Sequence, residues 1–95
     1  RAGDLLVSPT RHSAWRNGKA LNLQKIEFKL LTELVRNSGT TVTRSMLLER
    51  VWNYDFEPAT NIVEAYIRRL RIKLTEYGDD DPIKTIRGVG YMLRG

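Results

Sequence analysis

Ile67-Arg68-Arg69-Leu70-Arg71 sets three arginines inside a strongly periodic segment of this 95-residue chain. At about 100° per residue, the apolar side chains of the segment gather on one narrow helical face, and small or polar side chains gather on the opposite face. The apolar face contains Val63, Ile67, Leu70 and Leu74, and the opposite face contains Asn61, Ala65, Arg68 and Arg69. The pattern predicts a helix over about residues 60–77 that packs on one side and meets a partner on the other.

The arginine-bearing face indicates contact with a nucleic acid. A guanidinium can bond both a phosphate and the O6/N7 edge of guanine. No acid is interleaved among Arg68, Arg69, Arg71 and Lys73, so these like charges repel one another unless something neutralises them. The small Ala65 would let the helix approach a groove floor or a thymine methyl group. A solvated helix face is the alternative reading.

Composition and charge limit the class of protein. The chain is 41% hydrophobic and 28% charged, which fits a single globular domain over residues 1–95. A formal net charge of +5 and a pI of about 9.9 favour a polyanionic partner of unspecified kind. The chain has no cysteine, no apolar run long enough to span a membrane and no secretory signal, so we expect a cytoplasmic protein without a membrane partner. Because it begins with Arg1 rather than Met, we expect an excised domain whose upstream part is missing.

Short strands are predicted before the helices, at residues 5–7, 13–15 and 20–23. Asn17-Gly18 is a strong hairpin signal because both residues accept a positive φ. We expect a small antiparallel N-terminal sheet that depends on the rest of the domain for stability. Trp15 is assigned to the core, where indoles most often lie.

Two further helices are predicted, over residues 26–36 and from Thr43 to Trp52, separated by a stop signal at Gly39. Thr43 is expected to cap the second helix. Asn61 and Glu64 have the spacing of a capping box for the third helix, which Gly78 would end. With strands at 83–87 and 91–94, the fold class is α+β: a winged helix-turn-helix with a small N-terminal antiparallel sheet, three helices and a C-terminal β-hairpin wing.

The segment Thr85-Ile86-Arg87-Gly88-Val89-Gly90-Tyr91 predicts a hairpin with glycines at its tip. A nucleotide-binding glycine loop is a poor alternative, since there is no third glycine and no helix follows. These residues alone are equally consistent with a plain surface hairpin. Glycines at a tip permit close approach to a ligand surface, and Arg87 is well placed for a minor groove.

No constellation for catalysis or metal binding is predicted. The single His12 has no second histidine or cysteine near it, and a run of three aspartates at residues 79–81 lacks EF-hand spacing. General acid–base catalysis lacks a partner nucleophile for the acids expected on helical surfaces, which are Glu27, Glu33, Glu49 and Glu64. We therefore expect a protein without a cofactor that is not an enzyme.

The motifs together resemble the DNA-binding effector domain of OmpR/PhoB-type two-component response regulators. The resemblance covers nearly the whole chain, in four motifs that occur in the family's order. They are Leu23-Gln24 with Glu27 to Leu31, Val51-Trp52, Arg68 to Leu74, and Thr85 to Tyr91. Gln24 departs from the family's usual Thr or Ser, and we expect a first helix that either starts one residue away or is less well capped by about 1 kcal/mol.

The resemblance implies a transcription factor that binds tandem direct repeats of double-stranded DNA as a head-to-tail homodimer. An upstream receiver domain in the same protein is also implied, and none of the aspartates in this chain stands for its phosphoacceptor. The third helix would enter the major groove and the wing, about residues 83–94, the adjacent minor groove. Carried over by position, the base contacts are Asn61, Ala65, Arg68 and Arg69, the backbone contacts are Trp52, Tyr66, Arg71 and Thr85, and the minor-groove contact is Arg87.

The loop between the second and third helices is where proteins of this family commonly meet RNA polymerase. Here it contains Asn53, Tyr54, Asp55, Phe56, Glu57 and Pro58. Trp52, just before it, has packing as an alternative to phosphate contact. Two other partners stay open for the basic face: a structured RNA, and an acidic protein bound by a winged helix that never meets DNA.

Overall fold

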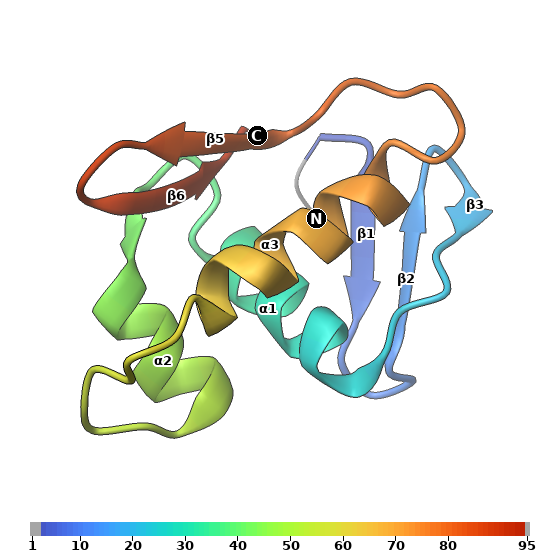
Figure 1. Ribbon diagram of the computed structural model, residues 1–95. Helices are drawn as coiled ribbons and strands as arrows, with labels where there is room; N and C mark the ends of the chain where they lie inside the picture. The colour runs from blue at the N-terminus through green and yellow to red at the C-terminus, as the bar shows by residue number, and fades with distance from the viewer. Residues whose placement is uncertain (1–2, 95) are drawn as a thin grey trace.

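The chain folds into two small sheets with three helices between them, as a computed structural model that describes residues 3–94 shows (Figure 1). The elements in order are β1 (Leu5–Ser8), β2 (Ser13–Arg16), β3 (Lys19–Ala20), α1 (Lys25–Arg36), β4 (Val42–Thr43), α2 (Arg44–Trp52), α3 (Ile62–Leu74), β5 (Ile83–Ile86) and β6 (Gly90–Leu93). The sheets have strand orders β1-β2-β3 and β4-β6-β5, and all their pairings are antiparallel. This is the predicted architecture. The predicted domain bounds, 1 and 95, lie outside the described residues.

The hairpin between β2 and β3 of the N-terminal sheet turns at the predicted Asn17-Gly18. Both residues have positive φ, 51° and 78°, as that turn requires. The third strand is shorter than the predicted 20–23: the chain leaves the sheet after Ala20 and packs Leu21 and Leu23 against the core. The assignment of Trp15 to the core was wrong. It pairs across the strands with the exposed Leu6 on the outer face of the sheet and is half-buried.

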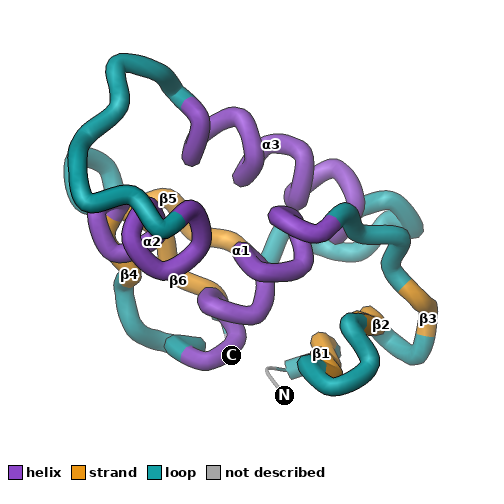
Figure 2. The backbone as a smooth tube through the Cα atoms, turned by 90° about the horizontal axis from the view of Figure 1, so that it is seen from below, coloured by secondary structure: helices purple, strands orange, loops and turns teal. Residues whose placement is uncertain are grey.

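The core lies between the helices. α1 contributes residues that are fully buried, because it packs against both other helices. α3 buries the four residues that periodicity predicted, Val63, Ile67, Leu70 and Leu74. Figure 2 shows α3 along one edge of the molecule with α1 and α2 on its inner side. The opposite face of α3 is therefore left to solvent.

The first two helices begin with side-chain hydrogen bonds. The weakness expected at Gln24 is offset by Glu27, whose Oε1 accepts a hydrogen bond of 2.8 Å from the backbone N–H of Gln24. Thr43 caps α2 as predicted, and its Oγ1 accepts from the N–H of Met46 at 3.1 Å.

The predicted ends of the third helix need correction. Asn61 makes no side-chain cap, and the expected capping box is absent because Glu64 is paired with Arg44 instead. α3 stops at Leu74, where Thr75 turns its hydroxyl back to the carbonyl of Arg71 at 2.8 Å. Gly78, with φ of 87°, ends the turn that follows rather than the helix.

The wing contains a third strand that sequence reasoning missed, β4, which pairs with β6. Gly90 lies opposite Thr43 in this pairing, and a Cβ atom there would overlap the carbonyl oxygen of Val42. The close approach that requires Gly90 is thus made by the domain's own backbone and not by an external ligand surface.

Candidate nucleic-acid interface

The outer face of α3 carries the residues predicted to contact bases. Asn61, Ala65, Arg68 and Arg69 are all exposed. Ile72 continues the same face one turn further and is 62% exposed, a position that sequence reasoning did not single out. The helix thus presents two exposed arginines, a small residue and an isoleucine on one face.

Arg69 is oriented by two aromatic side chains. Its guanidinium carbon lies 4.9 Å from the centroid of the Tyr66 ring, in the geometry of a cation–π contact. Tyr66 in turn meets Trp52 edge to face, with ring centroids 5.6 Å apart. Trp52 and Tyr66 are half-buried and both pack against the core, while the phosphate contact of Trp52 stays a prediction. This stack connects the end of α2 to the arginine face.

Arg71 is bonded to the wing. Its Nη2 donates to the carbonyl of Ile83 at 3.0 Å and to Oγ1 of Thr85 at 2.7 Å. Its Nε forms an ion pair with Asp81 at 2.9 Å, with a direction unsuited to a hydrogen bond. The aspartate run was therefore not simply a solvated loop, because Asp81 neutralises Arg71. Two of the four predicted DNA-backbone contacts, Arg71 and Thr85, are thus bonded to each other.

Lys73 also has an acidic partner that the local sequence conceals. Its Nζ lies 2.6 Å from Oε1 of Glu27, a residue predicted on the surface but only 1% exposed. Burial would raise the pKa of Glu27, but hydrogen bonds from Lys73 and the N–H of Gln24, with the charges of Lys73 and Arg69, lower that pKa below its ordinary value. Acids from elsewhere in the fold thus neutralise two of the four basic residues of α3.

Arg16, which contacts the end of α3, was not singled out from the sequence. It is 5% exposed, and its Nη1 donates to the carbonyl oxygen of Leu74, the last residue of α3, at 2.6 Å. Its Nε meets both carboxylate oxygens of Asp4, at 3.3 and 3.2 Å. Strand alternation places Arg16 on the inward side with Ala14, and that was the available signal.

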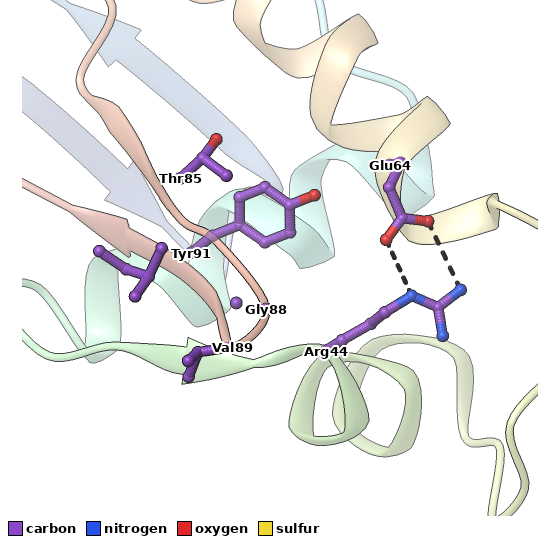
Figure 3. Close-up of a pocket in the computed structure, with 8 residues that line it drawn as sticks. Arg44, Glu64, Thr85, Gly88, Val89 and Tyr91 are labelled. Atoms are coloured by element: carbon purple, nitrogen blue, oxygen red, sulfur yellow. Dashed lines mark hydrogen bonds and ion pairs between the residues drawn. The ribbon is translucent and has the colours of Figure 1, made fainter.

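A cavity of about 250 Å³ separates the wing from the start of α3. Figure 3 shows Tyr91 on one side of it and the paired side chains of Arg44 and Glu64 on the other. Burial raises the pKa of the Tyr91 hydroxyl, and the Glu64 carboxylate adds to that shift. Burial would also raise the pKa of Glu64, but the hydrogen bond and charge of Arg44 lower it below the ordinary value.

The two predicted elements outside α3 are exposed. Arg87 lies in the turn of the wing hairpin, beside Gly88 with its φ of 75°. In the loop after α2, Tyr54 stacks on Phe56 with ring centroids 5.0 Å apart, and Phe56 is 60% exposed. Asn53 begins this loop in the left-handed conformation at φ of 60°. The remaining loop residues, Asp55, Glu57 and Pro58, are exposed or half-buried.

Within residues 3–94, no group of three or more His, Cys, Asp or Glu side chains is arranged to hold a metal ion. The helices of this described part of the chain are too short or too polar to cross a membrane.

A helix with an exposed arginine pair, set between a packed helical core and a hairpin wing, defines a winged helix-turn-helix domain. The family model described as "Transcriptional regulatory protein, C terminal" matches residues 18–93. The chain therefore belongs to this family of C-terminal regulatory domains and is of the OmpR/PhoB type, which confirms the predicted family and fold class.

Relatives and solved structures agree with this assignment. The chain is 44% identical over 93 residues to the transcriptional regulatory protein TcrA of Mycobacterium tuberculosis. The match covers 98% of this chain and 37% of TcrA. It is 47% identical over 78 residues to the response regulator ArlR of Staphylococcus haemolyticus, and this match covers 82% of the chain and 36% of ArlR. The chain thus spans little more than a third of these relatives.

Among solved structures, the DNA-binding domain of CpxR from E. coli is 31% identical, with a TM-score of 0.87 over 100% of this chain and 94% of that one. The RstA DNA-binding domain of Klebsiella pneumoniae, solved in complex with the RstA box, is 27% identical, with a TM-score of 0.87 over 99% and 94%.

Proposed function

We propose that this domain binds double-stranded DNA sequence-specifically and regulates transcription as the output domain of a response regulator. The observation that carries the proposal is the exposed pair Arg68 and Arg69, on a helix whose other face is buried beside the wing. Two exposed arginines on a helix that packs on its other side suit the major groove, where arginine bonds guanine in a bidentate manner. The similar RstA DNA-binding domain was solved in complex with the RstA box, which supports DNA binding by this domain.

In this proposal α3 reads bases with Asn61, Ala65, Arg68 and Arg69. Trp52 and Tyr66, which are packed on one another, face the phosphate backbone beside the groove. Arg71 and Thr85 meet a phosphate as a pair, since they are already bonded to each other. Arg87 enters the minor groove from the wing, where narrow A·T-rich segments concentrate negative potential.

The assembly is a head-to-tail homodimer on tandem direct repeats, with a receiver domain N-terminal in the same protein. The length of the relatives supports a further domain in the same protein, because they are far longer than the matched segment. RNA polymerase binds the loop of residues 53–58, where the stacked and exposed Phe56 lies beside the acids Asp55 and Glu57. The domain itself catalyses no reaction, needs no cofactor and acts in the cytoplasm.

Selection of bound sequences from a random duplex pool tests the proposal. Recovery of paired direct repeats is the expected result, and it reports readout and dimer geometry together. A domain that shifts no duplex even at low salt, where phosphate contacts are strongest, contradicts the proposal. Competition of the selected duplex against structured RNA at matched salt separates the RNA-binding alternative.

A further inference from the structure

The start of α3 contains a feature that opposes DNA binding. Glu64, in the first turn of the helix, carries a carboxylate whose side chain is 42% exposed. It is the neighbour of Ala65, which lies on the outer face. A free carboxylate here would repel the phosphates of any bound nucleic acid. The same turn has no side-chain cap from Asn61, so its first residues lack one of the usual stabilising contacts of a helix N-terminus.

Arg44 compensates for both weaknesses from the first residue of α2. Its Nε donates to Oε2 of Glu64 at 2.8 Å, and its Nη2 lies 3.4 Å from the other carboxylate oxygen (Figure 3). The same Nη2 donates to the carbonyl of Thr60 at 2.8 Å, and Nη1 forms an ion pair with Glu57. One guanidinium thus contacts Glu64 in α3 and both Thr60 and Glu57 in the loop that leads to this helix.

We propose that Arg44 is a positioning residue for DNA recognition, which masks the Glu64 carboxylate and fixes the start of α3 against α2. The inference rests on the function proposed above. Arg44 is suited to this role because its planar fork can bond a carboxylate and a carbonyl at once and keeps its charge at any physiological pH. Its side chain is only 25% exposed, so its nitrogens face the domain rather than solvent.

The alternative is that Arg44 touches a phosphate directly. The two roles differ in what Glu64 contributes. If Arg44 masks Glu64, the harm done by removing Arg44 comes largely from the bared carboxylate and disappears when that carboxylate is also removed. If Arg44 binds phosphate, removing Glu64 restores nothing, and the salt dependence of binding falls by about one phosphate contact.

The test is a double-mutant cycle with the selected duplex, measured at two salt concentrations. Arg44→Ala should bind about tenfold more weakly, Glu64→Gln within about threefold of wild type, and the double variant close to Glu64→Gln. Arg50→Ala is the matched control, because Arg50 is on the same helix but pairs with Glu33 of α1. A double variant as weak as Arg44→Ala overturns the masking role.

A second measurement needs no DNA. The amide of Ala65 donates to the carbonyl of Asn61 at 2.9 Å, the first helical bond of α3. Its hydrogen exchange should accelerate about tenfold in Arg44→Ala and in the milder Arg44→Gln, while Arg50→Ala leaves it unchanged. Unchanged exchange in both Arg44 variants overturns the positioning role. A wild-type domain that binds no duplex instead refutes the proposed function, whatever this exchange shows.

Discussion

Nη2 of Arg71 lies 2.7 Å from Oγ1 of Thr85, so a side chain of α3 and a side chain of the wing are joined by a hydrogen bond. The same nitrogen donates to the carbonyl of Ile83, and Asp81 completes the cluster. These contacts fix the wing relative to the helix. Under the proposed function, Arg71 therefore helps to set the separation between the major-groove and minor-groove contacts.

Arg71→Ala should leave the core sequence preference of the domain intact but loosen its preference at the flanking positions read by the wing. The reason is that the wing loses its link to α3 while Arg68 and Arg69 keep their places. Repeating the selection from random duplexes with the variant measures both preferences. Thr85→Val, which removes a single partner, should give a weaker effect in the same direction. Flanks as sharply selected as in wild type would contradict the role of the link.

Arg69→Ala should relax base preference at one position and weaken binding by about 1–3 kcal/mol, the cost of losing a bidentate contact to guanine. Titration of the selected duplex and of variants at each base pair measures this. Arg36→Ala is the control for net charge, because Arg36 is 68% exposed and lies on α1. If the two variants behave alike, Arg69 contributes only charge.

Arg87→Ala should weaken binding most at half-sites flanked by A·T-rich segments, whose narrow minor grooves attract an inserted arginine. The comparison is between two duplexes that share the half-site and differ in flank. Equal losses on narrow and wide flanks would exclude insertion into the minor groove.

Glu27→Gln should destabilise the domain by about 1–2 kcal/mol at pH 7, because a buried carboxylate bonded to Lys73 becomes neutral. The pKa of folded Glu27 lies below its ordinary value of 4.5, so this stabilisation is complete above pH 4.5 and is lost as the pH falls through the folded pKa. Urea denaturation across acidic pH should show the free energies of unfolding of wild type and variant converging. A gap that stays constant with pH would exclude an ionic origin.

Gly90→Ala should destabilise the wing strongly, since the new methyl group overlaps the backbone of β4 at Val42. We expect a loss of about 2 kcal/mol or more in the free energy of unfolding, as in overpacked sites. Thermal melting measures it, and Gly88→Ala is the control, where the added Cβ meets no atom within 4 Å and only the backbone conformation with φ of 75° is strained. Equal losses would place the requirement in backbone conformation instead.

Helix faces could be predicted because they depend on spacing within one element. Leu70 and Ile67 are buried and Arg68 and Arg69 exposed, as a period of about 3.6 residues requires. The predicted hairpin at Asn17 likewise follows from local backbone preference.

The partners of the charged side chains could not be predicted, because folding chooses them across long separations. Lys73 bonds Glu27, which lies 46 positions away in the sequence, and Arg16 bonds the carbonyl of Leu74, which lies 58 positions away. Glu64 had a local role available at Asn61 and took Arg44, 20 positions away, instead. Local pattern therefore identified the exposed arginines of α3, but not the buried Glu27 or which basic residues are neutralised within the domain.

The bond from Arg16 to the last carbonyl of α3 decides where the domain can be cut. The segment that the family model matches begins at residue 18, after both Arg16 and its partner Asp4. A fragment trimmed to that segment would lose β1 and β2 and leave the C-terminal end of α3 without its cation. A fragment that keeps the bond from Arg16 to α3 must therefore extend further at its N-terminal side than residues 18–93.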